Sequence, residues 1–233
     1  ISACDVEDRS VGAFIASAEM GRGELVLRMA ASEALVDARR ALQGALVSEE
    51  WARMNSVATF LADLPIHVDG TSPVTVFEVK GRVRRHIAEC SRKSGAKIRV
   101  VLVDYLQFLQ AVQVKGRSRE QEVAETAKEL KALAKDTNSC VIALAQAGRA
   151  VDKATTPPTL SDLRESGNIE AVADVVVFIH HPNGYREGGY AELHVAKHRG
   201  GPCGIVPVLW DPRFTRFANW EGPLPDCATP GAM

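Results

Sequence analysis

The sequence lacks the segments that mark membrane or secreted proteins. No apolar run approaches the roughly 20 residues that a transmembrane helix needs. No charged start leads into an apolar stretch and a small-residue cleavage site, which is the pattern of a signal peptide. These absences predict a cytoplasmic protein that has no membrane partner.

Cysteine pairs with metal-binding spacing are also absent. The five cysteines are odd in number and scattered, without a CxxC pair: Cys4, Cys90, Cys140, Cys203 and Cys227. We therefore expect reduced thiols and no structural zinc site. His180 and His181 are assigned no metal either, because adjacent residues of a strand point to opposite faces.

The chain has no surplus of positive charge. Lys and Arg number 28 against 29 Asp and Glu, so the net charge is −1. This balance argues against a protein that coats nucleic acid through bulk charge, but it is compatible with a local basic channel.

Short apolar runs rich in β-branched residues alternate with amphipathic stretches. The predicted strands are 11–16, 98–103, 140–145, 174–179, 190–196 and 204–210. The second, third and fourth are almost continuous in Val, Ile and Leu, which is typical of parallel strands covered on both faces. The last two alternate better and are joined by Arg199-Gly200-Gly201-Pro202, which favours an antiparallel hairpin.

Four helices are predicted between these strands. The first two cover 21–36 and 48–61, the second with Ser48 as its cap. The third starts at Ser72-Pro73 and ends at Gly95, and the fourth follows a candidate capping box of Ser118 and Gln121. The alternation predicts an α/β fold with a mostly parallel sheet, helices on both faces and an antiparallel edge hairpin.

Polar side chains stand where three predicted strands end. Asp104 ends one strand, and a carboxylate there can hold Mg²⁺ against nucleotide phosphates. Gln146 follows the next strand and could sense a γ-phosphate, while Glu19 follows the first and could orient an attacking water. Each residue alone is weak evidence, and for Asp104 alone turn chemistry is the better explanation, because apolar strands often end in Asp. Three of them at successive strand ends favour a nucleotide site.

Several motifs, in a fixed order, resemble the DnaB-type replicative DNA helicase family. They are Ser17-Ala-Glu-Met20, Val103-Asp-Tyr-Leu-Gln107, Ala145-Gln146 followed by Arg149, Leu160-Ser-Asp-Leu-Arg-Glu-Ser-Gly-Asn-Ile-Glu170, Ala173-Asp-Val-Val-Val177 and Val195-Ala-Lys-His-Arg-Gly200. The Asp-Leu-Arg-Glu-Ser-Gly block is the most specific of them. The resemblance implies that residues 1–233 are one RecA-like C-terminal motor domain of superfamily 4, with 218–233 as a flexible tail.

The resemblance also implies a role for individual residues. Glu19 matches the glutamate that activates water, Asp104 the Walker B aspartate that binds Mg²⁺ with ATP, and Gln146 the γ-phosphate sensor. Lys197 and Arg199 match a basic pair that reaches into the neighbouring subunit's nucleotide site, with Arg199 as the arginine finger. Without the resemblance, two such charges favour a solvated hairpin end.

A loop that contacts single-stranded DNA in the central channel is implied at Arg164, Glu165 and Gly167. Arg164 can hold a phosphate, and Gly167 lets the backbone approach closely. The alternative is a helix-capping loop, in which Ser161 is the cap and Arg164 pairs with Glu165.

A second candidate DNA-binding loop covers 113–119. It carries Lys115, Arg117 and Arg119 and follows a strand end, where ligands of open α/β sheets bind. Its composition suits phosphate contact, although a charged loop is more often simply solvated.

The family's phosphate-binding motif GxxxxGK[ST] is missing from the 233 residues. Its backbone N–H groups and Lys hold the β and γ phosphates. In the family it precedes the SxEM stretch by roughly twenty to thirty residues, a position before Ile1 here. We therefore expect a chain that is incomplete at its N-terminus, lacks the P-loop strand and helix, exposes apolar surface and hydrolyses little ATP alone.

The leading hypothesis is the motor of an ATP- and Mg²⁺-dependent 5′–3′ DNA helicase. In the family this motor forms a homo-hexameric ring around one DNA strand, and primase and a helicase loader are candidate partners. Two alternatives stay open. One is a non-catalytic remnant that binds single-stranded DNA or joins a partner ring. The other is a RecA- or KaiC-like ATPase, which shares the sheet but not the Asp-Leu-Arg-Glu-Ser-Gly block.

Overall fold

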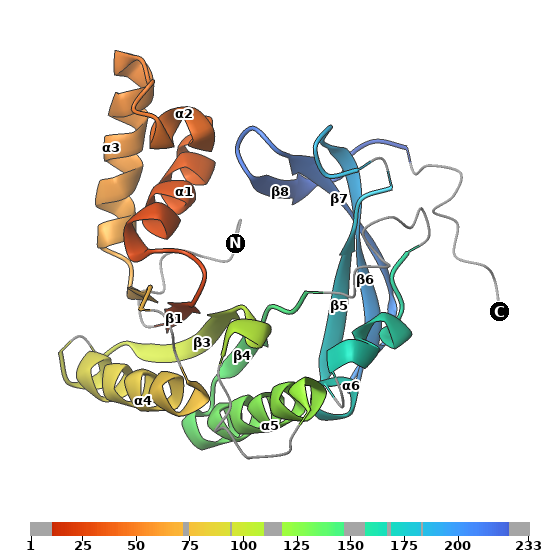
Figure 1. The fold of residues 1–233 in the computed structure, drawn as a ribbon. Coiled ribbons are helices and arrows are strands. Elements are labelled where there is room, and N and C mark those ends of the chain that lie inside the picture. The colour runs from red at the N-terminus through yellow and green to blue at the C-terminus, as the bar shows by residue number, and fades with distance from the viewer. Residues whose placement is uncertain are drawn as a thin grey trace.

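The structure is a computed structural model that describes residues 11–71, 75–93, 95–109, 118–146, 157–166, 169–182 and 184–223. Its strands form two four-stranded sheets (Figure 1). The first is parallel, in the order β2 (Ile66–Asp69), β1 (Val11–Ser17), β3 (Lys97–Asp104), β4 (Cys140–Ala143). The second is antiparallel, in the order β5 (Val175–His180), β6 (Gly189–His198), β7 (Gly204–Asp211), β8 (Arg216–Asn219). The predicted α/β class, with parallel strands and a late antiparallel part, is confirmed.

Helices connect the strands of the parallel sheet. They are α1 (Arg22–Ala34), α2 (Ala38–Leu42) and α3 (Ser48–Ala62) after β1, α4 (Val76–Lys93) after β2, and α5 (Arg119–Thr137) before β4. A 3₁₀ helix, η1 (Leu106–Phe108), follows β3, while η3 (Leu160–Ser166) and α6 (Ile169–Val172) precede β5. Within the described part of the chain, α4 and α5 lie side by side under the parallel sheet, and α1 approaches its β2 edge (Figure 1).

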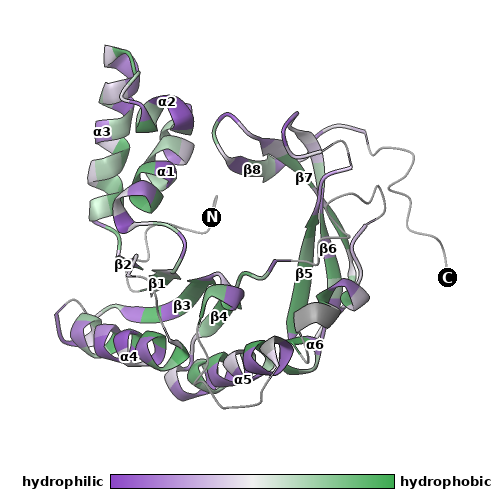
Figure 2. Cartoon of the chain, in the orientation of Figure 1, coloured by the Kyte–Doolittle hydropathy of each residue, from purple (hydrophilic) through white to green (hydrophobic). Residues whose placement is uncertain are grey.

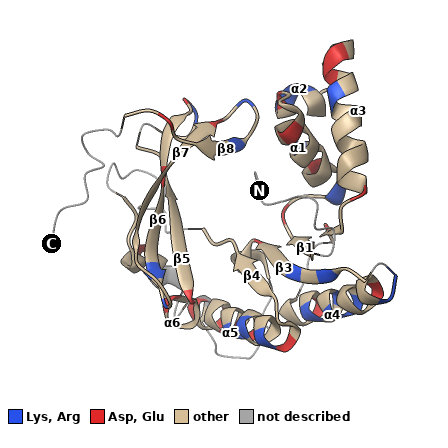
Figure 3. Cartoon of the chain, turned by 180° about the vertical axis from the view of Figure 1, so that it is seen from behind, with Lys and Arg blue, Asp and Glu red and all other residues tan. Residues whose placement is uncertain are grey.

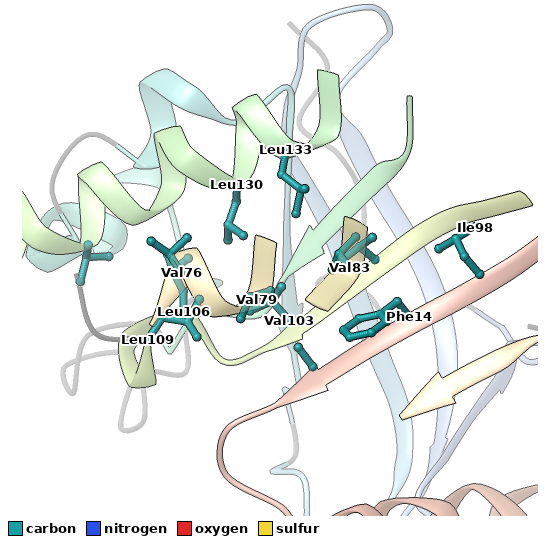
Figure 4. Close-up of a cluster of buried hydrophobic side chains, with 13 residues drawn as sticks. Phe14, Val76, Val79, Val83, Ile98, Val103, Leu106, Leu109, Leu130 and Leu133 are labelled. Carbon is teal, nitrogen blue, oxygen red and sulfur yellow. The ribbon is translucent and has the colours of Figure 1, made fainter. Parts of the chain in front are cut away.

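The main core lies between the parallel sheet and helices α4 and α5 (Figure 4). Phe14 and Val103 point from the strands toward Val79, Val83 and Leu133 of the helices, and all five side chains are buried. Helix and strand periodicity together produce this layer, since alternate strand residues meet one apolar stripe of each helix. Figure 2 shows the same division, with apolar strands inside and polar outer helix faces.

Helices α1 to α3 have a separate core. It consists largely of alanines from α1 and α2 packed around Met54 of α3, and small side chains allow the helices to approach closely. The turn between α1 and α2 is shaped by Asp37, whose side chain accepts hydrogen bonds from the backbone N–H groups of Arg39 and Arg40 at 2.8 and 3.0 Å. The sequence had not indicated α2.

Two of the predicted helix starts need correction. Helix α4 begins at Val76, after the predicted start at Ser72-Pro73, which lies outside the described residues. Thr75 and Glu78 form a reciprocal pair at this start: the Thr75 N–H donates to Glu78 Oε2 at 2.9 Å, and the Glu78 N–H donates to Thr75 Oγ1 at 3.2 Å. Ser48 is the first residue of α3 rather than its cap. The capping box of Ser118 and Gln121 before α5 is confirmed.

Strands β4 and β5 are less covered than the sequence indicated. Both were expected to be parallel strands buried on two faces. Instead, β5 pairs antiparallel with β6, and Ile142 of β4 and Val175, Val177 and Ile179 of β5 are exposed. Only alternate residues of β5 are buried, among them Phe178, which packs with Leu163 of η3. Continuous apolar composition was therefore a wrong indicator of two-sided burial for these two strands.

The end of the chain continues the antiparallel sheet farther than predicted. Strand β8 runs to Asn219, and the Trp220 ring packs edge-on against Tyr190 with their centroids 5.1 Å apart. Residues 218–220 of the predicted tail therefore pack on the sheet, and 224–233 lie outside the described residues. Among the residues that are described, no helix is long and apolar enough to cross a membrane.

Candidate functional site

Three polar residues singled out in the sequence follow neighbouring strands. β1 pairs with β3, with Ser17 opposite Asp104, and β3 pairs with β4. Since these strands are parallel, their carboxyl ends lie at one edge of the sheet, where open α/β sheets bind ligands. Asp104 is the last residue of β3, and Glu19 and Gln146 follow the ends of β1 and β4. We call these three residues, together with Tyr105, the strand-end site.

Asp104 is tied to the end of β1. Its Oδ2 atom accepts a hydrogen bond from Ser17 Oγ at 3.3 Å, and its carbonyl oxygen accepts one from the Ala18 N–H at 2.7 Å. Ser17 Oγ in turn accepts the Met20 N–H at 3.0 Å. These three bonds fold the chain around Glu19, whose side chain is exposed. The sequence placed Ser17 in a motif but contained no sign of this bracing role.

Gln107 holds the segment that carries Gln146. Its Nε2 donates to the carbonyl oxygen of Gln146 at 3.1 Å, and its Oε1 accepts the Gln146 N–H at 3.3 Å. One step earlier, the Leu106 N–H donates to the Leu144 carbonyl at 2.8 Å. These bonds extend the pairing of β3 and β4 beyond the ends of both strands.

Tyr105 lies within the electrostatic reach of the other three residues. Desolvation raises its pKa, and the nearby carboxylates of Glu19 and Asp104 raise it further, while a hydrogen bond with the Gln146 side chain lowers it. The phenol therefore stays protonated at neutral pH. Tyr105 is a functional candidate that sequence reasoning missed, although it stands in the same motif as Asp104.

The strand-end site offers one carboxylate well placed for a metal held together with a nucleotide. No group of three or more His, Cys, Asp or Glu side chains suited to a metal occurs in the described ranges. Mg²⁺ bound with a nucleotide needs only one or two carboxylates, since phosphate and water oxygens complete its octahedron. Asp104 fits that requirement.

Lys197 and Arg199 lie at the other sheet, where β6 ends. The Lys197 Nζ donates to the carbonyl oxygen of Glu170 in α6 at 2.5 Å. Arg199 Nη1 is 3.2 Å from Asp174 Oδ1, and Lys131 of α5 also pairs with Asp174. Figure 3 shows basic and acidic residues close together where α5, α6 and the start of β5 meet. The two basic residues thus bind to α6 and to the start of β5. Neither of these partners, Glu170 and Asp174, belongs to the strand-end site.

The two candidate DNA loops lie mostly outside the described residues. This holds for Lys115, Arg117 and Gly167, and for the side chains of Arg119, Arg164 and Glu165. The backbone of Arg164 and Glu165 belongs to η3, and that of Arg119 begins α5. Their roles in DNA contact therefore stay predictions.

The start of η3 is described and corrects one alternative. Asp162 Oδ2 accepts the Thr159 N–H at 2.6 Å, and the Thr159 and Ser161 hydroxyl oxygens are 2.7 Å apart. Thr159 and Asp162 therefore close the turn, and Ser161 is not its cap. Leu163 anchors η3 in the core under β5.

An open groove of about 460 Å³ lies between this turn and strands β6 and β7. Its lining includes Pro158, Thr159, His194 and Ile205. His194 is hydrogen-bonded to the buried carboxylate of Glu192, with His194 Nε2 and Glu192 Oε2 2.5 Å apart. The groove contains no residue of the strand-end site, so we do not assign it to nucleotide binding.

The parallel sheet and the side chains at its carboxyl edge define the class of the fold, a RecA-like ATPase domain. Residues 2–219 match the model of the family described as "DnaB-like helicase C terminal domain". The chain therefore belongs to the DnaB-like helicase C-terminal domain family.

Relatives agree with this assignment. The chain is 36% identical over 208 residues to the "Replicative DNA helicase DnaB" of Leifsonia xyli subsp. xyli (strain CTCB07), covering 87% of this chain and 44% of the relative. It is 34% identical over 228 residues to the "Replicative DNA helicase DnaC" of Bacillus subtilis (strain 168), covering 96% and 48%. The chain thus spans less than half the length of either relative.

Two solved structures share the fold at a TM-score of 0.81 and 27% identity, each match covering 92% of this chain. One is described as the structure of a DnaB-like replicative helicase and its interactions with primase, and the match covers 52% of that helicase chain. The other is an ATPase domain, of which 76% is covered.

Proposed function

We propose that this chain is the motor part of an ATP-dependent 5′–3′ replicative DNA helicase that works as a hexameric ring around single-stranded DNA. The observation that carries the proposal is the strand-end site: Glu19, Asp104 and Gln146 stand at the ends of three neighbouring strands in a chain of the DnaB-like family. Family membership also favours this function over that of a RecA- or KaiC-like ATPase. We propose a cytoplasmic location for this activity.

Each residue of the strand-end site has a proposed role in hydrolysis. Asp104 would hold Mg²⁺ with the nucleotide, and the ion would neutralise phosphate charge. The exposed Glu19 carboxylate takes no part in the hydrogen bonds of Asp104 and would orient the attacking water and accept its proton. Gln146, held through its backbone by Gln107, would hydrogen-bond the γ-phosphate.

Lys197 and Arg199 are proposed to act on the site of a neighbouring subunit. Their contacts with α6 and Asp174 support this, because those contacts lie on a different sheet from the strand-end site of the same chain. A guanidinium brought to the γ-phosphate stabilises the charge of the transition state. Hydrolysis would then depend on assembly of the ring.

Single-stranded DNA is proposed to contact Arg164, Glu165 and Gly167 at the end of η3, and Arg117 and Arg119 before α5. The buried Leu163 supports the first assignment, because it fixes η3 to the core and would transmit DNA contact into the domain. Primase and a helicase loader are proposed partners of the assembled ring. One of the two structural relatives is a helicase that interacts with primase.

Hydrolysis by the 233 residues alone is proposed to be negligible. These residues contain no GxxxxGK[ST] motif, so no lysine and glycine-rich loop of that kind grips the β and γ phosphates. The exposed apolar residues of β4 and β5 are consistent with a domain that needs a further segment. A non-catalytic protein that binds single-stranded DNA or joins another ring is the second candidate.

Sequencing the gene upstream of Ile1 and assaying its product separates the two candidates. We expect an in-frame GxxxxGK[ST] motif, DNA-stimulated ATP hydrolysis by the protein of the whole reading frame, and almost none by the 233-residue chain. A whole reading frame without the motif, whose product binds single-stranded DNA without hydrolysing ATP, would establish the second candidate. Substantial hydrolysis by the 233-residue chain would contradict the need for the motif.

A further inference from the structure

Asp174 stands between β5 and the basic residues at the end of β6. The β5–β6 ladder ends with Val175 opposite His198, and the next residues, Asp174 and Arg199, remain joined. The Arg199 N–H donates to the Asp174 carbonyl oxygen at 2.8 Å, and the Arg199 guanidinium reaches Asp174 Oδ1 at 3.2 Å. One aspartate therefore holds both the backbone and the side chain of Arg199.

We propose that Asp174 is the positioning residue of the arginine finger: it presets Arg199 for the nucleotide site of a neighbouring subunit. This inference rests on the proposed function, in which Arg199 acts in trans. Nothing in the family resemblance assigned a role to Asp174.

The geometry leaves Arg199 able to bind a second anion. A guanidinium has five N–H donors in a planar fork, and the contact with Asp174 uses one nitrogen, Nη1. The Arg199 side chain is 64% exposed, so much of its guanidinium faces solvent. An arginine fixed on one edge and open on the other loses less conformational entropy when it meets a phosphate.

The charges around Asp174 also favour binding of a phosphate by Arg199. Lys131 and Arg199 both pair with the Asp174 carboxylate, and the positive charge of Lys197 also acts on it. Three cations therefore surround one anion. The hydrogen bond from Lys131, followed by the positive charges of Lys131, Arg199 and Lys197, lowers the pKa of Asp174. The carboxylate is therefore ionised at neutral pH, and the cluster retains positive charge to offer an incoming phosphate.

Mixed rings test this inference in the protein of the whole reading frame. D174N keeps the size of the side chain but removes its charge, and we expect DNA-stimulated kcat to fall roughly 10- to 100-fold with little change in KM for ATP, because a displaced catalytic group costs rate more than binding. E19Q subunits have an intact Arg199 but a disabled site of their own. Rings co-assembled from D174N and E19Q subunits should therefore hydrolyse ATP faster than either variant alone. The reason is that, in a mixed ring, the intact Glu19 of a D174N subunit can lie next to the correctly positioned Arg199 of a neighbouring E19Q subunit.

Matched variants make each outcome decisive. D136N breaks the exposed ion pair of Asp136 with Arg84 and should leave kcat unchanged, while D174E should recover part of the activity lost in D174N. Rings of R199A and E19Q subunits are the positive control. If these control rings regain activity and the D174N rings do not, or if D174N leaves kcat unchanged, Asp174 has no positioning role. If the control rings themselves fail, the proposed action of Arg199 in trans is what fails.

Discussion

The side chain of Gln107 is paired with the backbone of Gln146, through a donated hydrogen bond of 3.1 Å and an accepted one of 3.3 Å. The two residues are 39 positions apart, and the pairing crosses from η1 to the segment after β4. It fixes where the backbone of Gln146 stands relative to Asp104. The pairing therefore bears on both stability and hydrolysis.

Replacing Gln107 with Ala removes both bonds. We expect the free energy of unfolding to fall by roughly 1–2 kcal/mol, since each net hydrogen bond contributes about 0.5–1.5 kcal/mol. We also expect kcat for ATP to fall in the whole-reading-frame protein, because Gln146 is no longer held. Chemical unfolding and steady-state hydrolysis measure the two effects. Q107E is the control: it keeps an oxygen that accepts the Gln146 N–H, but it loses the N–H group that donates to the Gln146 carbonyl. Full stability and activity in Q107E would show that the donated bond is dispensable.

An ion pair between Asp69 and Arg82 predicts how stability depends on pH. Burial alone would raise the pKa of Asp69, but hydrogen bonds from Thr71 and Arg82 outweigh it and lower the pKa. A carboxylate with a lowered folded-state pKa stabilises the protein above its unfolded value, near 3.9, and this contribution is lost as pH falls through the folded value. D69N should therefore cost about 1–3 kcal/mol at pH 7.

The measurement is chemical unfolding of wild type, D69N and D63N between pH 2 and 7. The difference between wild type and D69N should shrink on the acidic side. Asp63 is exposed at the end of α3, and D63N controls for the loss of one negative charge. A difference that stays constant down to pH 2 would show that the charge of Asp69 is not what stabilises β2 against α4.

The sequence was most informative where residue type and strand order act together. Asp104 and Gln146 could be placed at neighbouring strand ends because parallel strands bring their carboxyl ends to one edge. The contacts that join them could not be predicted. The bonds of Ser17 with Asp104 and of Gln107 with Gln146 depend on strand register and backbone direction, which no local pattern contains.

Other differences have local causes. Ser72-Pro73 is a strong helix-start signal, but the reciprocal bonds of Thr75 and Glu78 start α4 at Val76. An apolar strand can be covered on one face or two, and composition alone did not distinguish these cases for β5. Asp174 was missed because its partners, Lys131 and Arg199, lie 43 and 25 residues away in the chain.

The exposed apolar face of β5 predicts self-association of the 233-residue chain. Val175, Val177 and Ile179 are about half exposed and lie in one row on an edge strand, and such rows promote pairing with other chains. A lysine in place of Val177 should lower the weight-average mass seen by sedimentation at high concentration. V47K, at an exposed site before α3, is the control and should not change it. Equal association of both variants would place the contact elsewhere.

Arg164 is expected to contribute one phosphate contact to single-stranded DNA. In the whole-reading-frame protein, R164A should weaken binding and make the dependence of log K on log salt shallower by about 0.7, the value for one contact on a single strand. Titration with oligonucleotides at several salt concentrations measures this slope. An unchanged slope in R164A would count against contact at this loop. R186A, an exposed arginine in the β5–β6 connection, controls for the loss of a positive charge.

Glu19 is expected to act on the attacking water and not on nucleotide affinity. Its side chain is exposed beside the Ser17–Asp104 bond, so a glutamine fits the same space without disturbing that bond. In the whole-reading-frame protein, E19Q should lower kcat roughly 100-fold or more, the range for loss of a general base, while ATP binding stays near wild type. Equilibrium binding of a fluorescent ATP analogue and steady-state hydrolysis measure the two quantities separately. S17A, which removes the hydroxyl that braces Asp104, should instead weaken Mg²⁺-dependent nucleotide binding. If E19Q lost nucleotide affinity as S17A does, Glu19 would belong with the phosphate-binding residues and some other group would have to activate the water.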